Sequence, residues 1–169
     1  LLHGAGGTIS ARTIGKPVIG PPAVADLNGD GRLDLICTDG RRVLAIDPSG
    51  ANLRGWPRDV NDLFYLPVEV GVSASPTVAA GSKGMLVTAP TDAGILFLIG
   101  ADGELHDGWP RKAASVFEGP VEISARGGEA LMSWVDSSSQ VRSSQSTSRP
   151  KSSSRKRLNA RTPSTPLPR

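Results

Sequence analysis

Nine residues near the N-terminus combine the side-chain types and the spacing that bind a divalent cation. Side chains with oxygen atoms occupy positions 1, 3, 5 and 9 of this segment: Asp26, Asn28, Asp30 and Asp34. Position 7, Arg32, offers its backbone carbonyl oxygen, as position 7 does in other calcium loops. Calcium accepts about six to eight oxygen ligands in irregular geometry, whereas Mg²⁺ requires a tighter octahedron. The pattern therefore predicts one Ca²⁺ site with these five residues as ligands.

The residues around the loop indicate strands on both sides of it. An EF-hand would need Glu at position 12, where this chain has Cys37, and the flanking segments 22–25 and 33–38 resemble strands rather than helices. Gly29 and Gly31 permit the positive φ angles that a tightly curled loop needs. The alternative is a solvated turn without metal, because Asp, Asn and Gly favour turns through local hydrogen bonds. Without a cation, however, the crowded carboxylates would repel one another.

The chain contains an internal repeat. The motif Gly-Trp-Pro-Arg occurs at 55–58 and at 108–111, and the two tryptophans are 53 residues apart. Each unit consists of short runs of Val, Ile and Leu separated by Gly, Asp, Pro and Ser, which is typical of strands joined by turns. A unit of about 50 residues with four short strands has the size of a propeller blade. We expect Trp56 and Trp109 to pack at the outer ends of their blades, with an aromatic sugar platform as the alternative.

The repeat predicts an all-β fold, a partial β-propeller of about two to three four-stranded antiparallel blades with little helix. The predicted parts are an N-terminal edge strand or linker (1–16), a first repeat with the calcium loop (17–60), a second repeat without it (61–113), a partial third repeat (114–136) and a disordered tail rich in Ser, Arg and Pro (137–169). The second repeat has a shorter loop at 80–84 that contains no acidic residue, so we predict one metal site rather than two.

Composition narrows the possible functions. The formal charge is +3, but eight of the 19 Lys and Arg residues lie from Arg142 onward, where there is no acidic residue. The high isoelectric point therefore belongs to the tail, and we do not expect the folded part to bind nucleic acid. The single cysteine, Cys37, lies in an apolar run and is expected to be buried. His3 and His106 are isolated in sequence, and we find no acid–base pair that predicts catalysis. No apolar run is long enough to span a bilayer.

The tail from 137 onward has few large apolar residues, which predicts disorder. Two alternatives are binding to an anionic polymer and a non-native reading frame. Because two to three blades do not close a ring, we expect either a piece of a longer chain or pairing with other copies or partners.

The segment from Pro22 to Ile36, with the strand that ends at Asp47, resembles the calcium-loop propeller repeats of the FG-GAP and VCBS type. The resemblance covers roughly residues 17–113, and the absence of the Phe-Gly and Gly-Ala-Pro elements makes it closer to the VCBS branch. It implies a propeller, bound Ca²⁺, a secreted or cell-surface location and a non-catalytic role in adhesion through a protein or glycan partner. The alternative function is an accessory domain of a secreted hydrolase or lyase whose active site lies elsewhere. A quinoprotein propeller is a third option, but no cofactor-binding constellation supports it.

Overall fold

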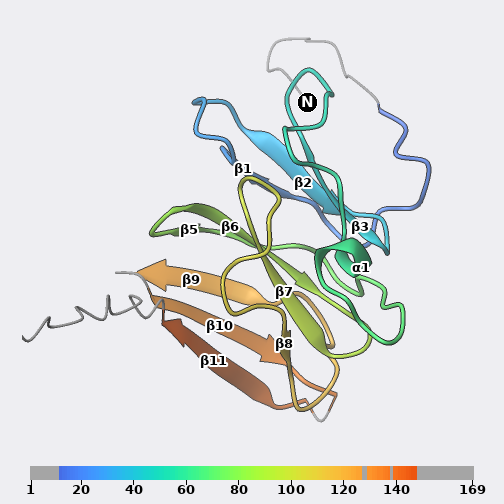
Figure 1. The fold of residues 1–169 in the computed structure, drawn as a ribbon, viewed down its shortest axis with the longest axis vertical. Coiled ribbons are helices and arrows are strands. Elements are labelled where there is room, and N and C mark those ends of the chain that lie inside the picture. The colour runs from blue at the N-terminus through green and yellow to red at the C-terminus, as the bar shows by residue number, and fades with distance from the viewer. Residues whose placement is uncertain (1–11, 127–128, 138, 148–169) are drawn as a thin grey trace, which may run out of the picture.

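The computed structural model of the protein describes residues 12–126, 129–137 and 139–147. Antiparallel strands form three sheets, which we call blades 1 to 3 (Figure 1). Blade 1 consists of β1 (Ala23–Ala25), β2 (Asp34–Thr38), β3 (Arg42–Ile46) and β4 (Arg58–Asp59). Blade 2 consists of β5 (Val78–Gly81), β6 (Gly84–Pro90), β7 (Ile95–Gly100) and β8 (Arg111–Lys112). Blade 3 consists of β9 (Glu122–Arg126), β10 (Glu129–Val135) and β11 (Val141–Thr147).

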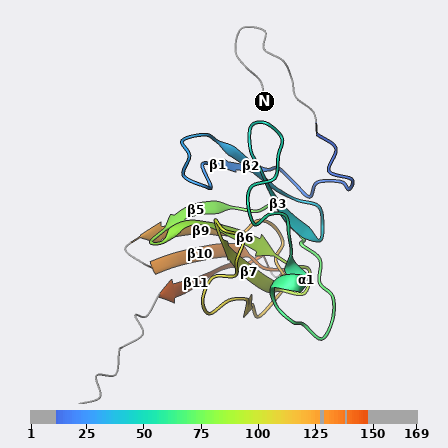
Figure 2. The same cartoon turned by 45° about the horizontal axis from the view of Figure 1, so that its top comes forward.

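The three blades follow one another in space in their order along the chain. Blade 2 lies between blades 1 and 3 in two views (Figures 1 and 2), and the first strands of successive blades, β1, β5 and β9, contact one another. The single helix in the described part of the chain is α1 (Val60–Leu63), one turn between blades 1 and 2 that is capped by the side chain of Asp59. The prediction of an all-β fold with little helix is confirmed.

Two hydrophobic cores hold the blades together, because each blade buries one face against the next. Between blades 1 and 2, blade 1 contributes Ile36, Val43 and Ala45, and blade 2 contributes Val87, Ala89, Phe97 and Ile99. Between blades 2 and 3, the facing residues include Leu86, Leu96 and Leu98 of blade 2 and Val121 and Met132 of blade 3. Successive side chains of a strand point to opposite faces, so the central blade is apolar on both. This explains the unbroken apolar run in β7 and the run in β6, which only Thr88 interrupts.

The first two blades are related residue by residue. The amide of Asp47 donates to the carbonyl of Ala51 at 2.9 Å, and the amide of Gly100 donates to the carbonyl of Glu104 at 2.8 Å. The same turn therefore closes β3 and β7, which makes Asp47 equivalent to Gly100. Trp56 and Trp109 occupy the same place after this turn and are both buried. The predicted repeat and the predicted packing of the two tryptophans are confirmed.

The repeated motif in blade 1 also makes hydrogen bonds to blade 2. The indole Nε1 of Trp56 donates to the carbonyl of Ala101 at 3.0 Å, and Nε of Arg58 donates to the carbonyl of Gly103 at 2.8 Å. A Cβ atom added to Gly55 would lie 2.0 Å from the carbonyl oxygen of Asp102, so only glycine permits this approach. The Gly-Trp-Pro-Arg segment of blade 1 thus binds a hairpin of blade 2.

One prediction is wrong in part. Residues 137–169 were expected to form a disordered tail, but residues 141–147 form β11, which pairs with β10 from Glu129 to Val135. A strand of polar residues can form here because pairing with the neighbouring strand satisfies its backbone. The third repeat therefore extends to Thr147 rather than ending at 136, and the rest of the expected tail, 148–169, lies outside the described residues. His3 and most of the expected N-terminal segment also lie outside them.

Within the described part of the chain, no helix has the length and apolar character needed to cross a membrane.

Candidate metal centre

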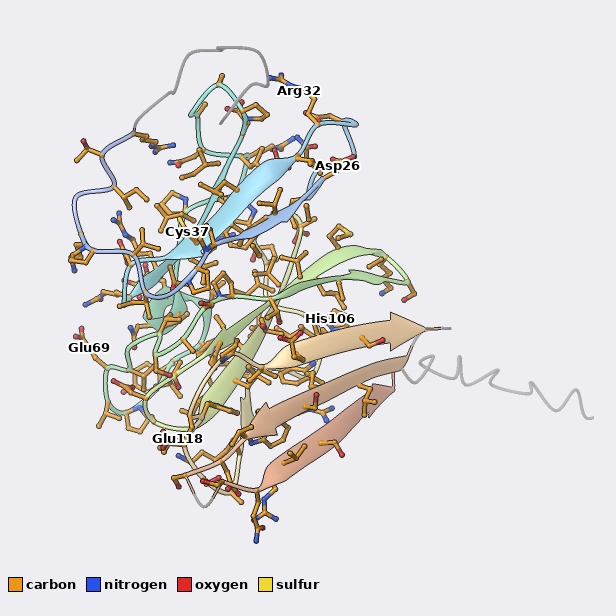
Figure 3. The ribbon with its side chains drawn as sticks, turned by 180° about the vertical axis from the view of Figure 1, so that it is seen from behind. Asp26, Arg32, Cys37, Glu69, His106 and Glu118 are labelled. Atoms are coloured by element: carbon orange, nitrogen blue, oxygen red, sulfur yellow. The ribbon has the colours of Figure 1, made fainter. Side chains whose placement is uncertain are left out.

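The predicted metal loop lies between β1 and β2, at one end of blade 1. Asp26 immediately follows β1 and Asp34 begins β2, so the loop joins two paired strands. Figure 3 shows Asp26 and Arg32 at this end of the sheet, away from blades 2 and 3. Gly29 and Gly31 have φ angles of 77° and 82°, as predicted for a tight curl. The strand-flanked arrangement is confirmed, and the helix–loop–helix alternative is excluded.

The loop wraps around the carboxylate of Asp26. Its Oδ1 accepts hydrogen bonds from the amides of Gly29 at 2.8 Å and Asp30 at 3.0 Å, and its Oδ2 accepts one from Gly31 at 2.9 Å. Three successive backbone N–H groups therefore point inward at one carboxylate. Oδ1 uses both of its lone pairs in these bonds, whereas Oδ2 retains one. The bonds therefore orient Asp26 and leave its Oδ2 able to coordinate a cation.

Two further side chains continue the same pattern. Oδ1 of Asn28 accepts a hydrogen bond from the amide of Asp30 at 2.9 Å, and Oδ1 of Asp30 accepts one from the amide of Arg32 at 2.8 Å. The Nδ2 of Asn28 also donates to Oδ2 of Asp30 at 3.1 Å. Predicted positions 3, 5 and 7 are thus connected in a single chain of contacts. All three residues are exposed to solvent, where a cation could reach them.

Asp34, at position 9, differs from the others because it is buried. Only 1% of the residue is exposed, and its Oδ2 accepts a hydrogen bond from the amide of Leu27 at 2.9 Å. Its Oδ1 is buried with no hydrogen-bond partner in the described structure. Burial raises the pKa of Asp34 above its ordinary value of 3.8, and the nearby charges of Asp30 and Asp26 raise it further. A buried carboxylate oxygen without a donor is costly, and a bound cation would remove that cost.

The carboxylates do not surround a single point in this conformation. Among residues 12–126, 129–137 and 139–147, no three His, Cys, Asp or Glu side chains form a group that could hold a metal ion. The predicted ligand set also includes the amide of Asn28 and the carbonyl of Arg32, which such a group does not count. The donors are all hard oxygen atoms, the type that Ca²⁺ prefers. The residues present therefore fit calcium in donor type and in sequence order.

The second blade has a plain hairpin where blade 1 has the loop. Gly81 pairs with Gly84, so only Ser82 and Lys83 connect β5 to β6. This short connection retains the strand pairing without any acidic residue. The extra residues in blade 1 are therefore not needed to join the two strands.

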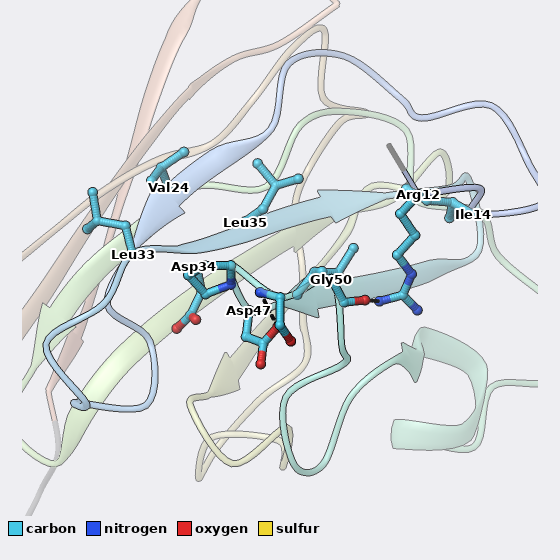
Figure 4. Close-up of a pocket in the computed structure, with 11 residues that line it drawn as sticks. Arg12, Ile14, Val24, Leu33, Asp34, Leu35, Asp47 and Gly50 are labelled. Atoms are coloured by element: carbon cyan, nitrogen blue, oxygen red, sulfur yellow. Dashed lines mark hydrogen bonds between the residues drawn. The ribbon is translucent and has the colours of Figure 1, made fainter. Parts of the chain in front are cut away.

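A hollow that was not predicted lies beside the loop on the free face of blade 1 (Figure 4). It has a volume of about 460 Å³, and its apolar lining includes Val24, Leu33 and Leu35. Asp34 and Asp47 line its polar side, and Figure 4 shows their carboxylates pointing in the same direction. The signal in the sequence was the repeat itself, because Val87, the residue of blade 2 equivalent to Leu35, is buried.

Cys37 and His106 form no further binding or catalytic site in the described part of the chain. Cys37 is buried, as predicted, and burial raises the pKa of its thiol. His106 lies in a turn of blade 2, distant from Asp26 in Figure 3, and its ring contacts the backbone carbonyl of Asp107.

Comparison with known proteins identifies the architecture. No protein-family profile matches the chain, and no curated protein is significantly similar to it. The solved structures that are similar include two of BBS1N in complex with ARL6DN, one soaked with mercury and one with lead. The first has a TM-score of 0.53 and 8% identity, and the match covers 77% of this chain and 51% of that chain. The second has a TM-score of 0.52 and 6% identity, with 77% and 52% covered.

These matches, together with the stacked antiparallel blades, define the fold as a partial β-propeller. The chain spans about half the length of the BBS1N chains that it matches. At this level of identity the likeness concerns the fold alone.

Proposed function

We propose that this chain is a calcium-stabilised, non-catalytic β-propeller module that binds a protein or carbohydrate partner outside the cell. The observation that carries the proposal is the free Oδ1 of Asp34, a buried carboxylate oxygen next to two other acidic side chains of one loop. Proteins seldom leave such an atom without a donor or a cation. The proposed ligands are the side chains of Asp26, Asn28, Asp30 and Asp34 and the backbone carbonyl of Arg32.

Calcium would act on the loop in two ways. It would neutralise the repulsion among three carboxylates, and it would satisfy the oxygen atom of Asp34 that lacks a donor. The backbone amides that already hold Asp26, Asn28 and Asp30 would keep these side chains oriented. Because the unfolded chain has no such loop, binding would stabilise only the folded state.

A melting experiment tests this proposal. At a Ca²⁺ concentration of 100 times its Kd, binding adds about 2.7 kcal/mol to the free energy of unfolding. For a chain of this size that corresponds to a rise in Tm of roughly 5–10 °C. We therefore expect a chelator to lower the Tm of the wild-type protein by this amount.

Two variants make the experiment specific. Asp30→Ala should melt at a low temperature whether or not the chelator is present, since it lacks one proposed ligand. Asp107→Ala, an exposed turn residue of blade 2, should respond to the chelator like the wild type. Equal melting of the wild-type protein with and without chelator would refute the structural metal site.

The partner part of the proposal is supported by the architecture. Propellers without a catalytic constellation commonly present loops and faces to other molecules, and the similar structures contain BBS1N in complex with another protein. The resemblance to FG-GAP and VCBS repeats supports a secreted or cell-surface location.

The second candidate function is an accessory propeller of a secreted hydrolase or lyase. The match to about half of a longer chain favours it, because further blades or domains would then accompany this one. Neither function requires a catalytic residue in this chain. The sequence of the gene on both sides would discriminate between them, since a catalytic domain beside the blades supports the second.

A further inference from the structure

The described structure has two outermost blade faces, one on blade 1 and one on blade 3. Each corresponds to a different face of blade 2, and the internal repeat therefore indicates what each would bind. The first is the outer face of blade 1, formed by Val24 and Leu35 with the buried residues Cys37, Leu44 and Ile46 behind them. Val24 is 58% exposed and Leu35 is 38% exposed. Ile14, from the N-terminal segment, packs against this buried part.

The register shows what covers the equivalent face in blade 2. Val24 pairs with Leu35 across β1 and β2, and Val78 pairs with Val87 across β5 and β6. In blade 2, Val87 is fully buried and Val78 is partly buried, because both lie in the core against blade 1. The outer face of blade 1 thus corresponds to a surface that another blade covers. Its exposed part lines the hollow shown in Figure 4.

The second free surface is the outer face of blade 3. The amide of Thr91 donates to the carbonyl of Ile95 at 2.9 Å, and the amide of Asp136 donates to the carbonyl of Gln140 at 3.0 Å. The turn between β6 and β7 is therefore equivalent to the turn between β10 and β11. Counting along the strands from these turns gives the equivalent residues of the two blades.

By this count, Leu131, Val135 and Val141 of blade 3 correspond to Leu86, Pro90 and Leu96 of blade 2. In blade 2, Leu86 and Leu96 are buried against blade 3. Leu131, Val135 and Val141 are instead exposed, Val141 to 77%. The outer face of blade 3 is thus equivalent to the face of blade 2 that packs against the next blade. The outer face of blade 1, with Val24 and Leu35, is equivalent to the opposite face of blade 2, so the two outer faces are complementary.

We propose that the outer face of blade 1 docks the outer face of blade 3 from a second copy of this chain, so that two copies associate head to tail. One chain carries both complementary faces, which is the condition for a heterologous contact between identical molecules. Two such contacts would join six blades, within the range of about four to eight that closes a propeller. The match covers only about half of the BBS1N chain, in agreement with further blades beyond the three described here.

The test is the mass of the protein in solution, measured by sedimentation equilibrium or by light scattering after gel filtration. The wild-type 169-residue chain is expected to have twice the mass of one chain. Leu35→Lys changes the face of blade 1 and Val141→Lys changes the face of blade 3, so each alone should have the mass of one chain. Val68→Lys is the matched control, since Val68 is 64% exposed but lies on neither face. It should remain a dimer.

Mixing the two disrupting variants tests the head-to-tail geometry. A pair made of one Leu35→Lys chain and one Val141→Lys chain retains one contact in which both faces are wild type. An equimolar mixture should therefore regain dimers that neither variant forms alone. If Leu35→Lys does not fold, as judged by circular dichroism, Val24→Lys replaces it.

A monomeric wild-type chain would overturn the proposal and leave further blades of a longer polypeptide, or a different partner, as the occupant. A mixture that stays monomeric, or a control variant that dissociates equally, would also overturn it.

Discussion

The same substitution at the two repeated tryptophans should have different effects on stability. Trp56 and Trp109 are equivalent and almost equally buried, with 6% and 5% exposed. Nε1 of Trp56 donates to the carbonyl of Ala101, whereas Nε1 of Trp109 is buried with no hydrogen-bond partner in the described structure. Trp→Phe removes a similar volume at both sites, so the packing loss largely cancels in the comparison.

The polar contributions have opposite signs. At Trp56 the change removes a hydrogen bond with a net value of about 1 kcal/mol. At Trp109 it removes a buried unpaired donor, whose cost is about 1–3 kcal/mol. We therefore expect Trp56→Phe to lower the free energy of unfolding by about 2–4 kcal/mol more than Trp109→Phe.

Urea denaturation followed by circular dichroism measures this difference, because an unchanged m-value turns a shift of the midpoint into a free energy. The mass of each variant must match that of the wild type under the same conditions. Equal losses for the two variants, or a larger loss for Trp109→Phe, would refute the assignment of the hydrogen bond to blade 1 alone.

Three further predictions concern acid stability, the buried thiol and the core. Burial alone would raise the pKa of Asp39, but hydrogen bonds from the backbone and guanidinium of Arg42 lower it below 3.8. The stability that Asp39 contributes is therefore present above about pH 4 and is lost as the pH falls through the lowered pKa. Asp39→Asn should flatten the dependence of the unfolding free energy on pH in this acid range. Cys37 should react with a thiol reagent only after denaturation, because it is 1% exposed, and rapid reaction of the native protein would contradict its burial. Phe97→Ala should lower the free energy of unfolding by about 3–5 kcal/mol in urea denaturation, because the side chain is fully buried between blades. Tyr65→Ala is the control: at a site that is 89% exposed, it should change this free energy by less than about 0.5 kcal/mol.

Local sequence patterns predicted the blades because turn residues mark both ends of each strand. The repeated Gly-Trp-Pro-Arg motif fixed the length of the unit, and the alternation of turn residues with short apolar runs fixed its strands. The loop from Asp26 to Asp34 was likewise predictable as a strand-flanked curl, since Gly29 and Gly31 take the positive φ angles that their positions require.

Contacts between blades were beyond such patterns. The bond from Arg58 to Gly103 and the close approach of Gly55 to Asp102 join residues 45 or more positions apart, and no local spacing indicates them. Strand β11 was missed because its side chains are mostly polar, and pairing with β10 satisfies its backbone without a large apolar contribution. The free oxygen of Asp34 also depends on burial, which only the folded arrangement determines.

We propose that the loop from Asp26 to Asp34 binds one Ca²⁺. Isothermal titration of Ca²⁺ into the metal-free 169-residue chain measures this directly, with Mg²⁺ as the competing ion and Asp26→Asn as the matched variant that keeps the size of the side chain. We predict one Ca²⁺ per chain, much weaker heat with Mg²⁺, and loss of binding in the variant. Absence of binding by the wild-type chain, or undiminished binding by Asp26→Asn, would contradict the proposed calcium site.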